Sequence, residues 1–197
     1  MTGKNNIKII LLGESGVGKT NLINVSLDRE FEENSASTNY CSYLEGILDY
    51  NNKKYSYALW DTAGQEIYRS LNRIFIKESK IILFVYSINN KDSFNEMEYW
   101  INSAEEILGE DKYIRALVGN KSDLFEEQIV SDDDAQKLAD KYKMKMKITS
   151  ALTDKAGFKL FLKELIIDYI ESFATEEENI NIKLVNQNDE QSKKKCC

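Results

Sequence analysis

The sequence predicts an α/β fold with a mostly parallel six-stranded sheet and helices on both faces, and three observations support this prediction. Short strand-like runs alternate with helical repeats along the 197 residues. A glycine-rich segment, residues 13–20, follows the first apolar run and opens the first helical pattern. The composition, 42% hydrophobic and 30% charged, fits one domain with a full core. We expect this domain over residues 1–173 and a flexible tail over 174–197.

The elements are expected in a regular alternation. The predicted strands are Ile7–Leu12, Ser42–Asp49, Lys54–Asp61, Ile81–Ser87, Ile114–Gly119 and Lys145–Thr149. The predicted helices are Lys19–Leu27, Ser93–Leu108, Asp132–Tyr142 and Lys155–Phe173. The longest apolar run, Ile81–Tyr86, has the length of a buried strand and is too short for a membrane span. Strands that alternate with helices indicate a parallel sheet covered on both faces.

Two of the helices show further detail. The second has an apolar stripe with helical spacing, made of Phe94, Met97, Ile101, Ala104, Ile107 and Leu108. We interpret this stripe as core, with Trp100 at its edge. The third helix begins after Ser131, because a serine followed three residues later by an acid fits a capping-box-like start. The acidic run 132–134 is therefore interpreted as a helix start rather than as a metal site.

Charge and cysteine content exclude several classes of protein. The formal net charge of −7 argues against nucleic acid as the main ligand. No long apolar segment follows the first residues, so neither secretion nor membrane spanning is expected. The cysteines Cys41, Cys196 and Cys197 suit no disulfide framework and, with no histidine, no ordinary zinc site. We expect a reducing, cytosolic setting, with Cys41 as small filler rather than a reactive thiol.

The segment Gly13–Thr20, GESGVGKT, has the spacing of a phosphate-binding loop. Backbone N–H groups of such a loop surround a phosphate, and the helix that follows points its positive end at the same charge. Lys19 is expected to reach the terminal phosphates, and the Thr20 hydroxyl to bind Mg²⁺. A chance glycine-rich turn is the alternative, which the neighbouring strand and helix patterns disfavour. The nucleotide-binding residues expected here are Ser15, Gly16, Val17, Gly18, Lys19, Thr20 and Asn21.

Three later strand ends also carry polar residues, and sheets of this type bind ligands beyond the carboxyl ends of their strands. After the third strand, Asp61 can hold a water of the Mg²⁺ shell and Gly64 lets a backbone N–H approach the γ-phosphate. Gln65 is placed to orient an attacking water. Asn120-Lys121-Ser122-Asp123 follows the fifth strand, and Thr149-Ser150-Ala151 the sixth. A carboxylate and a backbone N–H together can recognise guanine, although either short motif alone could be a solvated turn.

With these motifs in this order, the chain resembles the Ras superfamily of small GTPases, and most closely the Rab family of membrane-trafficking GTPases. The resemblance covers about residues 6–173 and rests on GESGVGKT, WDTAGQE, NKSD and TSA. It implies the P-loop NTPase, small GTPase fold and a switch that binds Mg²⁺ with GTP or GDP, hydrolyses GTP slowly and regulates vesicle trafficking. It also implies effectors, an exchange factor, a GTPase-activating protein and prenyl-delivery and extraction chaperones as partners.

The resemblance assigns roles to single residues. Phe31 is similar to the aromatic residue that packs against guanine, with an ordinary core role as the alternative. Thr38 is similar to the switch I threonine that binds Mg²⁺ and senses the γ-phosphate. Tyr43, Trp60 and Phe75 are similar to the aromatic triad that Rab effectors contact, with simple burial as an equal alternative. The implied base and phosphate ligands are Phe31, Thr38, Gly64, Asn120, Lys121, Asp123, Ser150, Ala151 and Leu152; the catalytic residues are Gln65, Lys19 and Thr38; the Mg²⁺ ligands are Thr20, Thr38 and Asp61.

Two departures from the family pattern limit these expectations. The segment after Thr38, Asn39–Tyr43, lacks the family's usual apolar and glycine residues, so the choice of effector cannot be predicted. Leu152 stands where many relatives carry lysine, which loses a side-chain contact with the base. We expect a somewhat altered nucleotide affinity and an unaltered base preference.

From about Thr175 the composition becomes acidic and amide-rich, and the sequence finishes with three lysines followed by Cys196-Cys197. This pair resembles the Rab site for double geranylgeranylation, which would hold the protein on the cytoplasmic face of intracellular membranes beside a cytosolic pool. Unmodified thiols are the alternative. Two other functions stay open at this point: a GTP-binding module that captures effectors without hydrolysis, and a Ran-like or Rho-like GTPase.

Overall fold

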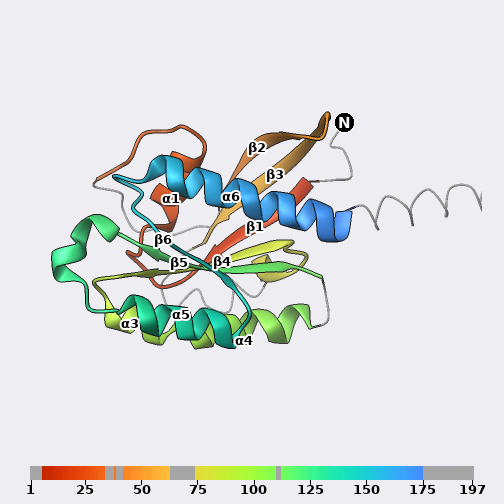
Figure 1. Cartoon of the computed structure of the whole chain (residues 1–197). Coiled ribbons are helices and arrows are strands. Elements are labelled where there is room, and N and C mark those ends of the chain that lie inside the picture. The colour runs from red at the N-terminus through yellow and green to blue at the C-terminus, as the bar shows by residue number, and fades with distance from the viewer. Residues whose placement is uncertain (1–5, 34–37, 39–41, 63–73, 110–111, 175–197) are drawn as a thin grey trace, which may run out of the picture.

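The computed structural model describes residues 6–33, 38, 42–62, 74–109 and 112–174. It shows one sheet of six strands in the order β2-β3-β1-β4-β5-β6. Neighbouring strands are parallel except for β2 and β3, which are antiparallel. Helices α1 and α6 cover one face of the sheet, and α3, α4 and α5 cover the other (Figure 1). The predicted fold class is confirmed.

All six predicted strands are present, with ends that differ by at most one residue. They are β1 (Asn6–Leu12), β2 (Ser42–Tyr50), β3 (Lys53–Asp61), β4 (Ile81–Ser87), β5 (Ile114–Asn120) and β6 (Lys145–Ile148). The β2–β3 hairpin turns at Asn51 and Asn52, whose φ angles of 48° and 61° are those of a two-residue turn with the handedness that hairpins favour. Because β4 is buried along its whole length, the sheet has a core on each face.

The α-helices are α1 (Lys19–Ser26), α3 (Lys91–Asn95), α4 (Met97–Leu108), α5 (Asp132–Lys141) and α6 (Lys155–Tyr169). Two helix predictions were wrong in detail. The single helix expected from Ser93 is a pair of helices that meet at Glu96. The pair starts before Ser93, because the Asn90 side chain caps it by accepting from Ser93 N.

The last helix, expected to reach Phe173 as an α-helix, ends in a π-helical turn, Ile170–Ala174. A 3-10 helix, Ser122–Glu127, was not predicted.

The position of Trp100 is a further correction. Trp100 is only 1% exposed, so it lies in the middle of the apolar face of α4 and not at its edge. It stands one turn from Met97 and from Ala104, and both are fully buried, whereas Phe94 and Ile107 are only partly covered. Phe94 and Ile107, rather than Trp100, therefore lie at the edges of the apolar stripe.

The acidic run 132–134 forms the first turn of α5, so its interpretation as a helix start is confirmed. Ser131 caps this helix, because its Oγ accepts a hydrogen bond of 3.1 Å from Asp134 N. Within the part of the chain that the structure describes, no cluster of acidic, cysteine or histidine side chains could hold a metal ion. None of the described helices is long and apolar enough to cross a membrane.

Candidate active site

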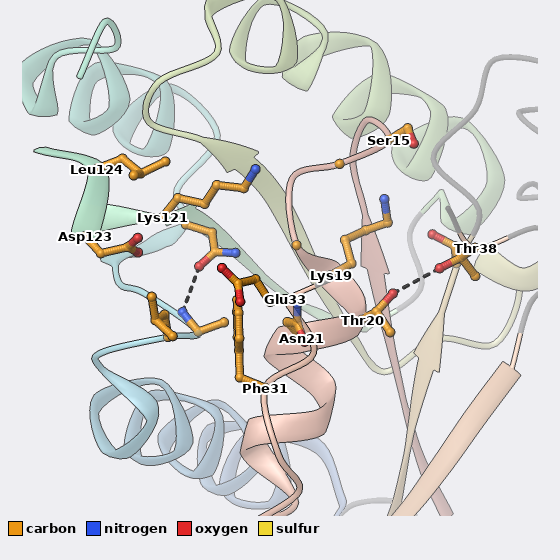
Figure 2. A pocket seen from close by; sticks show the side chains of 16 residues that line it. Ser15, Lys19, Thr20, Asn21, Phe31, Glu33, Thr38, Lys121, Asp123 and Leu124 are labelled. Atoms are coloured by element: carbon orange, nitrogen blue, oxygen red, sulfur yellow. Dashed lines mark hydrogen bonds between the residues drawn. The ribbon is translucent and has the colours of Figure 1, made fainter. Parts of the chain in front are cut away.

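The predicted loops meet in one pocket of about 480 Å³ at the carboxyl ends of the strands (Figure 2). Of the predicted residues, Ser15, Gly16, Gly18, Lys19, Thr20, Asn21, Phe31, Thr38, Asn120, Lys121, Asp123, Ala151 and Leu152 line it. Glu33, Thr62 and Leu124 also line it and were not predicted. Val17 and Ser150 lie behind the lining and hold it by hydrogen bonds. The convergence of segments more than 100 residues apart makes this pocket the candidate site.

The phosphate loop depends on glycine at three positions. Gly16 and Gly18 have φ angles of 77° and 93°, which residues with a side chain rarely adopt. A Cβ atom on Gly13 would stand 2.0 Å from the carbonyl oxygen of Val85 in β4. Gly18 is the N-cap of α1 and has no side chain to cap it, an arrangement that leaves the first N–H groups of the helix for an anion.

Lys19 is the buried cation of the site. Its Nζ donates to the carbonyl oxygens of Gly13, at 2.8 Å, and Glu14, at 2.9 Å. Burial lowers the pKa of Lys19 to about 8, although the negative charges of Asp61 and Glu14 act in the opposite direction. An anionic ligand beside Nζ would favour the charged form further.

Three oxygen-bearing side chains converge beside Lys19. Thr20 Oγ1 donates to Asp61 Oδ2 at 2.7 Å and lies 3.0 Å from Thr38 Oγ1, which is itself 3.3 Å from the same carboxylate oxygen. Burial raises the pKa of Asp61, against the hydrogen bond from Thr20 and the charge of Lys19. Among the described side chains, Asp61 Oδ1 is the buried polar atom left without a hydrogen-bond partner. A set of hard oxygen ligands with one unused carboxylate oxygen fits Mg²⁺.

Asn120 joins the phosphate side of the pocket to the base side. Its side chain is buried; Nδ2 donates to Val17 O at 2.8 Å, and Oδ1 accepts from Ala151 N at 3.1 Å. The Ala151 N–H, expected to donate to a base, therefore already has a partner in this structure. Asn120 thus fixes the distance between the two loops.

The carboxylate of Asp123 is oriented by the loop after β6. Ser150 Oγ donates to Asp123 Oδ1, and the same Oγ accepts from the backbone N–H groups of Leu152 and Thr153, both at 3.1 Å. Leu152 itself is 48% exposed and lines the pocket, at the position where the resemblance suggests a lysine. The structure therefore brings the predicted base-recognition residues together as expected.

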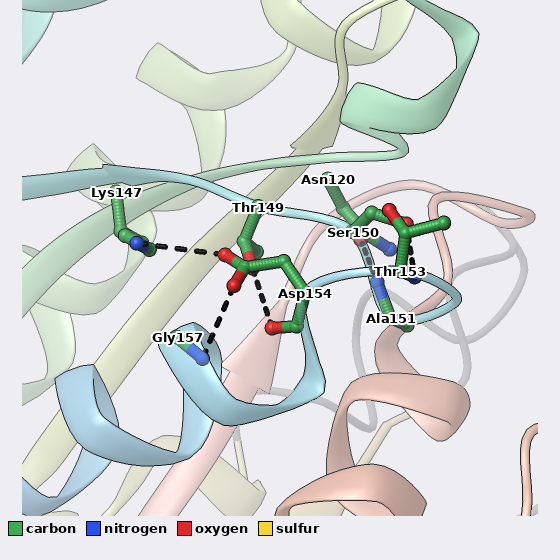
Figure 3. A network of polar contacts seen from close by, with 8 residues as sticks. All are labelled: Asn120, Lys147, Thr149, Ser150, Ala151, Thr153, Asp154 and Gly157. Atoms are coloured by element: carbon green, nitrogen blue, oxygen red, sulfur yellow. Dashed lines mark hydrogen bonds and ion pairs between the residues drawn. The ribbon is translucent and has the colours of Figure 1, made fainter.

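An acidic residue that the sequence reasoning missed anchors this loop (Figure 3). Asp154 caps α6 by accepting from Gly157 N at 3.1 Å, and it accepts from Thr149 Oγ1 at 2.9 Å. Lys147 Nζ lies 3.5 Å from the same carboxylate. The signal was present in the sequence, because an aspartate directly before a helical pattern is a common N-cap.

The segment after α1 is fixed by Asn21, through a contact that the sequence did not predict. Asn21 Nδ2 donates to Glu32 O at 3.0 Å and its Oδ1 accepts from Glu32 N at 2.9 Å, so the amide holds this backbone on both sides. The neighbouring Phe31 is half-buried, lines the pocket and also packs against the core. The core contact of Phe31 is therefore present, and its packing against guanine stays a prediction.

The aromatic residues of the predicted effector surface are contiguous. Tyr43 stacks on Trp60 with ring centroids 5.0 Å apart, and Trp60 contacts Phe75 at 5.9 Å. Tyr43 is 52% exposed, so simple burial does not describe it. Five predicted residues, Cys41, Gly64, Gln65, Cys196 and Cys197, lie outside the described residues.

Known proteins resemble the chain over most of its length. The model of the Ras family matches residues 8–171. Ras-related protein Rab-21 of Geodia cydonium is 38% identical over 155 residues, which are 79% of this chain and 67% of that protein. Rab-21 of Homo sapiens is 36% identical over 79% of this chain and 68% of its own length. Rab-11B of Dictyostelium discoideum is 40% identical over 145 residues, 74% of this chain and 66% of that protein.

Proposed function

From the premise that the chain belongs to the Ras family as a Rab-like small GTPase, which binds and hydrolyses GTP and regulates vesicle trafficking, we propose a role for each of its site residues. The observation that carries the proposal is the single pocket into which the phosphate loop, Thr38, Asp123 and Ala151 converge. In this proposal the β- and γ-phosphates of GTP lie over residues 13–20, and the guanine base lies between the ring of Phe31 and the carboxylate of Asp123.

Guanine is selected by Asp123. Its carboxylate accepts from the N1–H and the exocyclic amine of the base, an arrangement that adenine does not offer. The hydrogen bond from Ser150 fixes the carboxylate in that direction. Because the Ala151 N–H is bonded to Asn120, the base oxygen shares this donor or takes it over.

Magnesium would be held by the hydroxyls of Thr20 and Thr38 and, through water, by Asp61, and when bound it would neutralise part of the negative charge of the phosphates. The chain's own contribution is to hold the three oxygens together, with Asp61 Oδ1 left to accept from a bound water. Lys19 adds a positive charge of its own beside the phosphates. Its hydrogen bonds to the carbonyl oxygens of Gly13 and Glu14 hold Nζ over the phosphate loop.

We assign the orientation of the attacking water to Gln65. The chain offers no arginine that we assign to the transition state, so hydrolysis without a partner is slow and a GTPase-activating protein completes the site. Release of the γ-phosphate removes its interactions with Thr38 and Gly64. The two segments that carry these residues, which act as the switches, then lose their hold on the nucleotide. The exposed ring of Tyr43, stacked on Trp60, is the proposed centre of effector contact.

Attachment to membranes is assigned to Cys196 and Cys197 as sites of prenylation, because two long lipid chains give stable binding where one is marginal. Delivery and extraction chaperones would then be partners. This places the protein on the cytoplasmic face of intracellular membranes, with a cytosolic pool. The Rab-like relatives favour this function over a Ran-like or Rho-like one.

Single-turnover GTP hydrolysis tests the enzymatic part. Wild type should hydrolyse bound GTP slowly, and Gln65→Leu should bind GTP equally well and hydrolyse it at least about tenfold more slowly, since a water-positioning group contributes at this scale. Gln136→Leu, which changes an exposed glutamine on α5, is the matched control. A Gln65→Leu rate equal to wild type, with and without an activating protein, would reject Gln65 as the water-positioning residue.

Fractionation and intact-mass measurement test the membrane part. Changing Cys196 and Cys197 to serine should leave nucleotide binding intact and move the protein from the membrane fraction to the supernatant. A native protein with no lipid on either cysteine, or a double variant that still sediments with membranes, contradicts the assignment.

A further inference from the structure

Trp100 connects helix α4 to the phosphate loop that follows β1. Trp100 is 1% exposed and lies in the core on the face of the sheet that α1 does not cover. Its Nε1 donates to Glu14 Oε1 at 3.1 Å. A buried indole N–H requires an acceptor, and here the acceptor is a carboxylate from a residue 86 positions away. The bond is therefore charge-assisted and long-range.

Glu14 occupies an unfavourable place for a negative charge. It is the second residue of the phosphate loop, between Gly13 and Ser15, and its own carbonyl oxygen accepts from Lys19 Nζ at 2.9 Å. A carboxylate free to turn towards the phosphates would repel them and would compete for the ammonium of Lys19. Among the described residues, Ser15 and Lys19 line the pocket whereas Glu14 does not.

We propose that Trp100 is a positioning residue for nucleotide binding: its N–H holds the Glu14 carboxylate against α4, so that the carboxylate stays out of the pocket lining and does not approach the phosphates over the loop. The inference rests on the proposed function, because it requires phosphates over residues 13–20. It assigns to α4, which supplies no residue to the pocket lining, a direct effect on ligand affinity.

The test is the rate at which a fluorescent GDP analogue leaves the full-length protein. Trp100→Phe keeps an aromatic ring in the core but removes the N–H donor together with part of the buried ring system, and we expect release of the analogue to become about tenfold faster, or ~1.4 kcal/mol. In the double variant Trp100→Phe with Glu14→Gln, the side chain at position 14 carries no charge. Release should then return to within about twofold of wild type. Tyr99→Phe, at the neighbouring and more exposed ring, is the control and should leave the rate unchanged.

A purely structural role for Trp100 predicts a different pattern, since a cavity in the core would not be repaired by neutralising Glu14. Trp100→Phe with release like wild type, or a double variant that stays as fast as Trp100→Phe, overturns the proposal. Failure of wild type to bind the analogue would instead reject the proposed function.

A second measurement leaves the core intact. The chain has two tryptophans, so an NMR spectrum of ¹⁵N-labelled protein contains two indole N–H signals. Glu14→Gln replaces a charged acceptor with a neutral one, so the Trp100 signal should move while that of Trp60 stays in place. A Trp100 signal that does not respond overturns the contact on which the proposal stands.

Discussion

Replacing Asn120 with alanine should damage stability and nucleotide affinity together, because its side chain is the direct link between the phosphate loop and the base loop. The substitution removes the donor to Val17 O and the acceptor of Ala151 N. Both backbone groups belong to buried residues. An orphaned buried polar group costs about 1–3 kcal/mol, so two of them give ~3 kcal/mol even if water partly replaces the lost contacts.

Urea unfolding of the nucleotide-free protein measures the first effect, and titration with GDP the second. We expect Asn120→Ala to lower the free energy of unfolding by about 3 kcal/mol and the affinity for GDP by about two orders of magnitude, at ~1.4 kcal/mol per tenfold. Asn102→Ala is the control, since the Asn102 side chain is exposed and accepts a single long bond, 3.4 Å, from Tyr142. An Asn120→Ala protein within 0.5 kcal/mol of wild type, with its GDP affinity changed less than about twofold, would refute the reasoning.

Three further outcomes are expected. Asp123→Asn should weaken GTP binding and improve binding of xanthosine triphosphate in a direct titration, because the exchanged group now donates to the base. Leu152→Lys should slow GDP release about two- to fivefold, since a lysine stem and charge would cover the base at this half-exposed position. Gly13→Ala should abolish stoichiometric GDP binding, because the new Cβ would stand 2.0 Å from Val85 O and must displace the loop.

Local patterns predicted the parts of the site that depend on backbone geometry. The glycines of GESGVGKT are required where φ is positive or the backbone approaches β4, so their spacing is visible in one segment. The strand ends were equally predictable, since the phosphate loop and the loops after β3, β5 and β6 each follow a short apolar run. These features need no knowledge of which elements become neighbours.

Contacts between distant elements were not predictable in this way. Nothing in the sequence near Trp100 indicates that its N–H meets Glu14, because that meeting depends on the sheet order and on the angle at which α4 packs. Asn21 lines the pocket as expected, but its bonds to Glu32 depend on the path of the chain after α1. The prediction that Trp100 lies at the edge of the stripe was wrong. The spacing of apolar residues shows roughly which side of a helix faces the core, but only the packed structure shows which residue is at the middle of that side.

The discontinuity of the pocket gives the nucleotide a mechanical role. Its walls come from segments around Gly18, Thr38, Asn120 and Leu152, so a single bound molecule cross-links stretches of chain that are far apart in sequence. Ligand present at a thousand times its dissociation constant adds ~4.1 kcal/mol to the free energy of unfolding. Such a gain is comparable with that of a disulfide closing a loop of this length. The bound nucleotide therefore acts as a reversible cross-link, and we expect the free energy of unfolding to rise with the concentration of guanine nucleotide.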